Sequence, residues 1–555
     1  MLSELKKPVC VFSALGVAVT IWLMWFTDWP LGVDGEWAWK RHAGFGSLLE
    51  AADRLLPALL SGSVLVFWAR YGERRIDHAR RLQTVSLYSV LLLIAGLWIT
   101  NVQTAAPQSH RNIKPYWVLY DPGASGYFME AAFEISSVDM FLAGYEERMQ
   151  EGEVLHVGTH PPGLFLLSSF CLHACETSPQ LVSFLNAFEN RDFREAFHEV
   201  ESAAHLRPPL NRTQLPALQM LSGLTTLFCI LTVVPIAVLA RLCFPRRTAW
   251  IMTCLCTTAP CLAVFLPKSD LLFPLTGTAI LVLAVAAMQG GRWLWLSIPA
   301  GVMLWLGLTL SLAHLPVVAV LIAYSGFRIV FLSRGSGQGS GSALISPVSA
   351  ATTAATVFSL MVVVVALLCV WFLSATGCSL WNVWQLNLKN HSGFYDQFPR
   401  TWWKWLFENP LELSFALGLP LAGFAAAGVL RCSRRLFSHV RSPLVADAGL
   451  NDNKSQLLIR IPLCLAIALT WAALWISGKN QGEAARLWCF LVPWFALCAG
   501  GLLETLEHAA VRKRAFPESS VSSQLDLFRQ TTTVLLTCQL AASLATVSRV
   551  SGFSF

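Results

Sequence analysis

The sequence predicts an all-α protein, a bundle of helices that crosses a membrane many times. Charged residues make up only 13% of the 555 residues and hydrophobic residues make up 55%, whereas about 25% of an average soluble chain is charged. The deficit of charge extends along the whole chain, which favours many spans over one anchor. The 22 Trp and 33 Phe residues are typical of membrane interfaces and lipid-facing surfaces.

A helical span needs about 20 mostly apolar residues. About thirteen stretches of the sequence meet this requirement. They lie near 9–27, 54–70, 84–101, 215–241, 248–266, 271–289, 293–312, 315–332, 350–374, 411–430, 461–477, 488–505 and 530–547.

The basic residues predict which side each connection faces, because cytoplasmic connections carry an excess of Lys and Arg. With the N-terminus inside, the densest basic clusters all become cytoplasmic: 70–81, 243–250, 431–442 and 511–516. The external side then receives 28–49, a long loop at 103–214, 266–270, a loop at 375–410, and 478–486. The apolar stretch 163–175 is too short to cross, so we expect a juxtamembrane helix there, in the outer interface.

These spans divide the chain into four parts. Residues 1–83 form N-terminal spans that read as an addition, and residues 84–332 form a transmembrane module that carries the external loop 103–214. The Gly/Ser-rich stretch 333–348 is predicted to be a cytoplasmic linker. Residues 349–555 supply the C-terminal spans and the external loop 375–410.

The loop 103–214 is too long to be a plain connection, since loops above about 12–15 residues are usually functional or disordered. It contains "VLYDPGASGYFMEA" (118–131) and "LHVGTHPPGLFLL" (155–167), and "NRTQLPALQML" follows at 211–221. Further along, "FLPKSDLLFPLTG" (265–277) places an Asp at the external end of a span.

The order and sidedness of these motifs resemble the GT-C superfamily of integral-membrane glycosyltransferases, especially the protein O-mannosyltransferase and aminoarabinose transferase branch. The resemblance covers roughly 84–310. It implies transfer of a sugar from a polyprenyl-phosphate donor to an acceptor on the external face. The resemblance implies an acceptor that is a lipid, a glycan or a protein, and we expect membrane lipids to surround the spans.

The resemblance also implies roles for single residues. Asp121 matches the family's first-loop acid and Asp270 its second external Asp, so both are catalytic candidates. His160 matches the basic residue before the Pro-containing turn, and Arg212 the Arg before the next span. The family's acid usually follows its first span, so Asp34 and Glu36 in "VDGEW" remain the alternative to Asp121.

The chemistry of the residues supports the same site. A carboxylate such as Asp121 can take the proton of an acceptor hydroxyl, and an Arg fork suits phosphate. Arg486, at an external span end, joins His160 and Arg212 as a candidate for the donor phosphate. Supporting candidates are Glu130, His156, Tyr127 and Glu483.

Each candidate has a structural alternative. Asp-Pro-Gly starts turns, Asp270 can cap a helix, and Arg486 can pair with Glu483 at i,i+3. Trp402, Trp403 and Trp405 form either an aromatic belt or a platform for sugar or prenyl groups.

Other kinds of site are disfavoured or left open. The 15 cysteines show no metal-ligand spacing, so a bound metal is open and a divalent cation is one option. The net charge of +7 sets topology and does not indicate nucleic acid.

The leading hypothesis is therefore a hexosyltransferase of the GT-C type in a multi-pass plasma or bacterial inner membrane, with its site facing the periplasm or exterior. The alternatives are a transporter or flippase of a lipid-linked saccharide, and a ligase or polymerase of such saccharides. Carboxylates in external loops, away from the bilayer midplane, favour the enzyme over the transporter.

Overall fold

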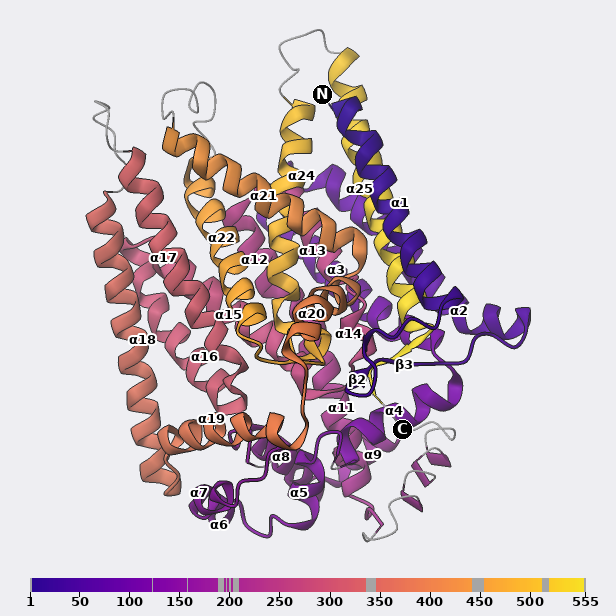
Figure 1. The fold of residues 1–555 in the computed structure, drawn as a ribbon, viewed down its shortest axis with the longest axis vertical. Helices are drawn as coiled ribbons and strands as arrows, with labels where there is room; N and C mark the ends of the chain where they lie inside the picture. The colour runs from indigo at the N-terminus through magenta and orange to yellow at the C-terminus, as the bar shows by residue number, and fades with distance from the viewer. Residues whose placement is uncertain are drawn as a thin grey trace.

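The chain forms a bundle of long helices whose axes run mostly in one direction, with short helices gathered at one end (Figure 1). This is a computed structural model. It describes residues 2–553 apart from 122, 157, 188–193, 196, 199–200, 203–208, 336–345, 442–453 and 512–518. The prediction of an all-α, polytopic bundle is confirmed, and the protein is an integral membrane protein.

Within the described residues, ten helical stretches are long and apolar enough to cross a membrane. Each coincides with a predicted span. They are Lys7–Phe26 of α1 (Leu2–Phe26); α2 (Leu48–Arg75); α3 (Arg81–Val102) with η1 (Gln103–Ala105); α11 (Gln214–Leu231) with α12 (Val233–Cys243); η2 (Ser269–Leu272) with α15 (Phe273–Ala287); η3 (Gly291–Leu296) with α16 (Ser297–Leu310); η4 (Leu312–His314) with α17 (Leu315–Gly335); α18 (Pro347–Thr376); α22 (Lys454–Ile476); and η7 (Cys489–Leu491) with α24 (Val492–Val511).

The three remaining predicted spans differ from simple crossings. The stretch 248–266 is divided between α13 (Arg246–Cys256) and α14 (Cys261–Val264), and 411–430 between α20 (Trp402–Leu417) and α21 (Leu419–Arg441), which meet at 111°. The stretch 530–547 lies in α25 (Ser519–Val547), which runs beside α1 (Figure 1) but is less apolar than the ten. The described spans therefore number ten, or eleven with the bent pair, against the expected thirteen or so.

The bend between α20 and α21 is stabilised by one side chain. Gly418 ends α20 with φ +85°, a conformation that glycine adopts without strain. The amide of Gln539, on α25, donates to the carbonyl of Leu417 (2.5 Å) and accepts from the backbone N–H of Leu421 (3.1 Å). A break in a membrane helix must have its freed backbone groups satisfied in this way.

Glycines let pairs of spans approach closely. A side chain at Gly428 of α21 would lie 1.9 Å from the Cys498 carbonyl of α24, and one at Gly72 of α2 would lie 2.2 Å from the Trp250 ring. Small residues at such crossings are usual in membranes, where packing rather than hydrophobicity holds helices together.

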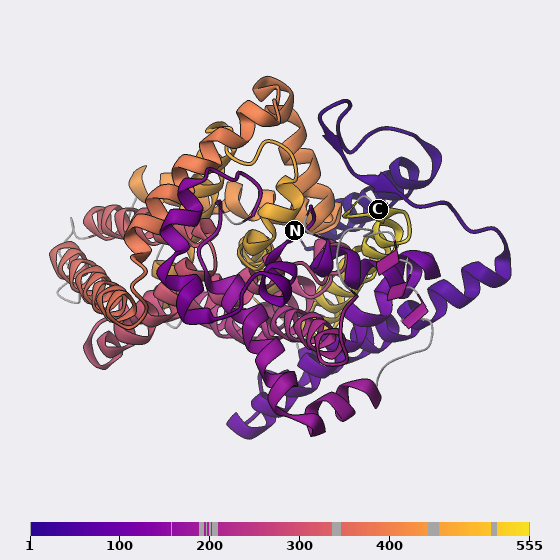
Figure 2. The same cartoon turned by 90° about the horizontal axis from the view of Figure 1, so that it is seen from below.

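The short helices at one end build the long loop that the sequence predicts. They are α4 (Gln108–Tyr120), α5 (Tyr127–Phe133), α6 (Val138–Ala143), α7 (Tyr145–Gln150), α8 (Gly163–Thr177) and α9 (Pro179–Ala187), with α19 (Leu380–Gln397) lying across the same end (Figures 1 and 2). The predicted helix at 163–175 is thus present as α8. Two amides of α19 tie it to the loop, because Asn387 donates to the Thr159 carbonyl and Asn390 to the Gly158 carbonyl.

The part of the chain that the structure describes contains four short strands, which lie beside this loop. β1 (Gly32–Val33) and β2 (Trp37–Ala38) form an antiparallel hairpin, and β3 (Lys40–Arg41) pairs with β4 (Val550–Ser551). The second pair joins the segment after α1 to the segment after α25.

The basic connections lie at the opposite end of the bundle from the loop. The N-terminus, the ends of α17 and α21, and the start of α25 all lie there (Figure 1). The turn after α2 belongs to this end, because Arg70 donates to Thr533 in the first half of α25 (3.0 Å). The predicted linker 333–348 falls mostly outside the described residues, so its conformation and the four-part division stay predictions.

This arrangement predicts how introduced cysteines react. Ser136, between α5 and α6, and His78, after α2, are both exposed, and the positive-inside rule places them on opposite sides. We expect Ser136→Cys in intact cells to react with an impermeant maleimide, and His78→Cys to react only after permeabilisation. The unaltered protein is the background control, since its fifteen cysteines are buried or half-buried. The reverse pattern would invert the topology.

Candidate active site

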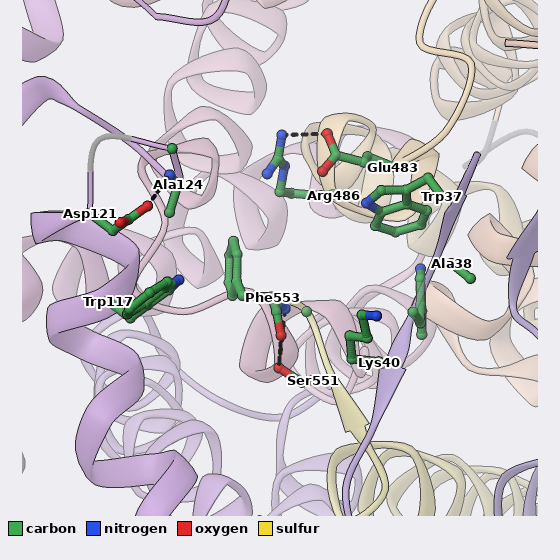
Figure 3. Close-up of a pocket in the computed structure, with 13 residues that line it drawn as sticks. Trp37, Ala38, Lys40, Trp117, Asp121, Ala124, Glu483, Arg486, Ser551 and Phe553 are labelled. Carbon is green, nitrogen blue, oxygen red and sulfur yellow. Dashed lines mark hydrogen bonds and ion pairs between the residues drawn. The ribbon is translucent and has the colours of Figure 1, made fainter. Parts of the chain in front are cut away.

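A cavity of about 210 Å³ opens among four segments that are far apart in the sequence (Figure 3). The walls come from the β1–β2 hairpin and β3, from the end of α4, from the segment before α24, and from the segment after β4. The lining residues are Trp37, Ala38, Trp39, Lys40, Trp117, Asp121, Gly123, Ala124, Glu483, Arg486, Ser551, Gly552 and Phe553.

Asp121 ends α4 and begins the turn into α5. Its carboxylate Oδ1 accepts from the backbone N–H of Ala124 (2.9 Å), and its carbonyl accepts from the N–H of Ser125 (3.0 Å). The turn bonding predicted for an Asp-Pro-Gly sequence is therefore present, although Pro122 itself lies outside the described residues. The half-buried carboxylate lies at the cavity wall (Figure 3).

Arg486 faces Asp121 across the cavity (Figure 3) and is held by two carboxylates. It belongs to α23 (Ala484–Leu487), whose N-cap Glu483 has φ +58°. Nη2 of Arg486 lies 2.7 Å from Glu483 Oε2, and Nε lies 3.8 Å from Asp270 Oδ2. Burial would lower the pKa of this guanidinium, but the carboxylates of Glu483 and Asp270 raise it above its usual value. The i,i+3 pair that the sequence suggested is thus real, and Asp270 approaches the same cation.

Lys268 is a charged residue of the site that the sequence analysis did not single out. It is 3% exposed, its ammonium donates to the carbonyl of Ala124, and it lies 5.9 Å from the centre of the Tyr127 ring. Burial, followed by the charge of Arg486, lowers its pKa to about 8. The available signal was a Lys two residues before Asp270 in "LPKSD", since a lysine kept at a span end needs a partner or a task.

His156 and His160 pack around Tyr127 behind the Asp121 turn. Their ring centres lie 5.6 and 5.3 Å from that of Tyr127, and neither lines the cavity. Burial, followed by the charge of Lys268, lowers the pKa of His156 far below its usual value and that of His160 to about 3. Both imidazoles are therefore neutral near pH 7, so His160 can offer a phosphate only a hydrogen bond.

Two other candidates lie outside the cavity. Arg212 is exposed just before α11 and is absent from the cavity lining. Glu130 forms an ion pair with Arg148 on α7 and is also absent from the lining. Their predicted roles stay predictions, with no support from the position of either side chain.

The alternative acidic motif, Asp34 and Glu36, has a structural task in the fold. Asp34 is exposed on the β1–β2 turn. The Glu36 carboxylate accepts from the Thr401 backbone N–H (2.9 Å) and hydroxyl (2.5 Å) and from Trp405 Nε1 (2.7 Å). It thereby caps the N-terminus of α20, where a negative charge is favourable. Neither carboxylate lines the cavity, although the strand after them does.

The aromatic residues of the cavity are not the ones that the sequence suggested. Trp402 and Trp403 are 47% and 60% exposed, as an interfacial belt requires, and Trp405 is buried against Glu36. The cavity instead takes Trp37, Trp117 and Phe553. Nothing local in the sequence marks these three, because three distant segments must first come together.

Within the described residues, no group of three or more His, Cys, Asp or Glu side chains could hold a metal ion. The carboxylates of Asp270 and Glu483 both approach Arg486.

Comparisons with known proteins give a distant likeness. No family model and no curated protein matches the chain. Two solved structures of the oligosaccharyltransferase from Archaeoglobus fulgidus are similar, each at 14% identity. The structure in complex with Zn and sulfate has a TM-score of 0.37 and covers 81% of this chain. The archaeal oligosaccharyltransferase AglB in complex with an inhibitory peptide and a dolichol-phosphate has a TM-score of 0.39 and covers 80%.

The present chain spans 52% and 56% of those two chains. At this identity and these scores the likeness assigns neither a residue nor an activity. Membership of the GT-C superfamily therefore stays a prediction, and the case for function rests on the geometry of the site.

The role of Glu36 can be tested through stability. We expect Glu36→Gln to destabilise the protein by about 1–3 kcal/mol, because an amide NH₂ would face the donors of Thr401 or Trp405. Burial raises the pKa of Glu36, but its hydrogen bonds from Thr401 and Trp405 prevail and lower the pKa below its usual value. The stabilisation is therefore present above the unfolded pKa and is lost as the pH falls through the folded one. Thermal unfolding in detergent measures both effects.

Asp34→Asn is the matched control for Glu36→Gln, and we expect it to leave the unfolding temperature unchanged because Asp34 is exposed. If Glu36→Gln or Asp34→Asn kept full stability but lost turnover, the acidic motif after α1 would be the catalytic one.

Proposed function

We propose that this protein transfers a sugar from a polyprenyl-phosphate donor to an acceptor at the loop-bearing face of the membrane. The observation that carries the proposal is the shared cavity of Asp121 and Arg486. A carboxylate and a largely buried guanidinium lie on opposite sides of one cavity (Figure 3). Such a pair suits a reaction in which a proton is removed at one point and a phosphate leaves at another.

The carboxylate of Asp121 would act on the acceptor. As the acceptor oxygen attacks the anomeric carbon, its proton passes to the carboxylate. The bond between the anomeric carbon and the phosphate oxygen breaks, and the phosphate leaves with the electron pair. The hydrogen bond from Ala124 fixes one oxygen of the carboxylate, which leaves the other free for the acceptor.

Arg486 would bind the leaving phosphate. A guanidinium presents a rigid fork of N–H donors that matches phosphate geometry, and Glu483 and Asp270 hold this fork in place. The pKa of Arg486 is raised, so its charge is present at any working pH. The negative charge that develops on the phosphate would therefore meet a fixed positive charge.

The size and walls of the cavity fit a sugar. Its volume of about 210 Å³ is below the roughly 300–1,000 Å³ of sites for drug-sized ligands, so it suits a single ring with its phosphate. Trp37, Trp117 and Phe553 offer apolar surfaces against which the face of a sugar ring can pack, while polar groups at the rim can meet its hydroxyls.

The position of the cavity suits a lipid-linked donor. Its walls include β2, β3 and the end of α4, which lie in the half of the bundle away from the basic connections (Figure 1). If the positive-inside rule holds, this half of the bundle faces the exterior or periplasm. Nucleotide sugars are cytoplasmic, so a donor anchored in the membrane is the one that reaches this side.

The direct test is transfer of label by the purified protein. Radiolabelled polyprenyl-phosphate hexose in detergent or liposomes should lose its label to acceptor lipids or glycans from the native membrane. A nucleotide sugar should give no transfer. Loss of donor from one side of a liposome with its sugar–phosphate bond intact would instead identify a transporter.

Asp121→Asn separates chemistry from binding. The amide oxygen of Asn can still accept from Ala124, so the turn is kept, but the basic carboxylate is lost. We expect turnover to fall by about a hundredfold or more, the usual scale for acid–base catalysis, with donor binding unchanged. Asp34→Asn, in the alternative motif, should retain turnover. The reverse result would assign the chemistry to the loop after α1.

Arg486→Lys probes the phosphate contact. A lysine is a point charge and cannot reproduce the fork. We expect donor affinity to weaken by roughly ten- to a hundredfold, the effect of one lost charged hydrogen bond. Titration of donor, with thermal unfolding as the check on folding, measures this. Arg212→Lys is the matched control and should keep wild-type affinity; weakening by Arg212→Lys alone would move the phosphate to the start of α11.

A further inference from the structure

Lys268 lies in a short segment that reaches both charged parts of the site. Its ammonium donates to the carbonyl of Ala124, beside Asp121. Two residues later, the carboxylate of Asp270 lies 3.8 Å from Arg486. The segment 268–270 therefore contacts the Asp121 turn with one side chain and Arg486 with the next charged one.

Ala124 is held from both sides. Its N–H donates to Asp121 Oδ1 (2.9 Å) and its carbonyl accepts from Lys268. The two bonds share one short stretch of backbone, so the position of the ammonium determines where the turn lies. The position of the turn then determines where the Asp121 carboxylate points, because Oδ1 of that carboxylate accepts a hydrogen bond from the N–H of Ala124.

Lys268 is also separated from the cavity. It is 3% exposed and is absent from the cavity lining, whereas Arg486 is part of it. The ammonium lies behind the wall that Ala124 forms. A phosphate in the cavity would therefore meet Arg486 and not Lys268.

We infer that Lys268 is a positioning residue: through the Ala124 carbonyl it fixes the turn that aims Asp121 at the acceptor, and it does not bind the donor phosphate. The inference rests on the sugar transfer proposed above. The inference gives the two cations different roles: Arg486 sets donor affinity, and Lys268 sets the rate of the chemical step.

The charges around Lys268 predict a pH dependence. Burial and the charge of Arg486 lower its pKa to about 8, against the carboxylates of Asp270 and Glu483, which raise it. Among the described residues, the titratable and charged groups that act on Lys268 come from three places. They are Asp121 and Tyr127 from the turn and α5, with the neutral His156 and His160; Asp270 from η2; and Glu483 and Arg486 from the segment before α24.

The ammonium is thus charged below about pH 8 and loses its proton as the pH rises through that value. A neutral amine forms a weaker bond to the carbonyl than an ammonium does. We expect kcat of the unaltered protein to decline above about pH 8 while its affinity for donor stays constant.

Two variants test the inference with kinetics. Lys268→Met should lower kcat by roughly ten- to a hundredfold, the range for one charged hydrogen bond, and leave KM for polyprenyl-phosphate hexose unchanged. Lys268→Arg keeps a permanent cation, so it should restore part of kcat and abolish the decline near pH 8. Arg486→Lys should show the reverse pattern, with its main effect on KM for the donor and not on kcat.

Lys114→Met is the control for burial alone. Lys114 is 7% exposed, and its ammonium donates to the carbonyls of Ala263 and Val264 without touching the Asp121 turn. It should lose thermal stability as Lys268→Met does, but keep the pH profile of the unaltered protein.

Hydrogen exchange gives a readout that does not need activity. Peptides covering 118–131 should exchange faster in Lys268→Met than in the unaltered protein or in Lys114→Met. If the unaltered protein transfers no sugar, the proposed function fails, but faster exchange would still support the hold of Lys268 on the turn. Unchanged exchange with unchanged kcat, or a rise in KM instead of a fall in kcat, overturns the inference. Should Lys268→Met fail to fold, Lys268→Arg and the pH profile decide.

Discussion

The burial of two cations at the ends of the spans is the constraint around which the site is organised. Lys268 is 3% exposed and the side chain of Arg486 is 16% exposed, and a charge with so little access to water is costly unless other groups compensate it. The compensation comes from Glu483 and Asp270 for the arginine and from the carbonyl of Ala124 for the lysine. Those partners lie in different stretches of the chain, so satisfying the cations brings the first loop, the start of α15 and the segment before α24 to one place.

The outer wall of the site depends on contacts between the two ends of the chain. β3 pairs with β4, which sets Lys40 opposite Ser551, and Glu36 caps α20 from the preceding hairpin. Three spans precede the loop that carries Asp121, and the first two read in the sequence as an addition to the predicted module 84–332. In the fold, the segment that joins these two spans belongs to the site, because its residues from Trp37 to Lys40 line the cavity.

The features that the sequence predicted correctly are those that depend on residues close together in the chain. Ten spans follow from apolar length, the Asp121 turn from its Asp and Gly, and the pair of Glu483 with Arg486 from their spacing of three. The bend at Gly418 was missed because a glycine in an apolar run is compatible with a continuous helix until Gln539 satisfies the broken backbone. Lys268 and Phe553 were missed for the same kind of reason, since their roles depend on residues more than a hundred positions away.

The electrostatics of the site also explain why its histidines are buried as neutral groups. An imidazolium at His156 or His160 would lie beside Lys268, and that repulsion adds to the cost of burial. Arg486, in contrast, has carboxylates as neighbours: Glu483 contacts Nη2, and Asp270 lies next to Nε. A guanidinium already fixed in this way loses little conformational freedom when a phosphate binds. Pre-organisation of this kind favours the charge that develops as a bond breaks over charge that is already spread in the donor. Under the proposed function, the two carboxylates would hold the fork of Arg486 in an orientation from which its remaining N–H groups meet the leaving oxygen.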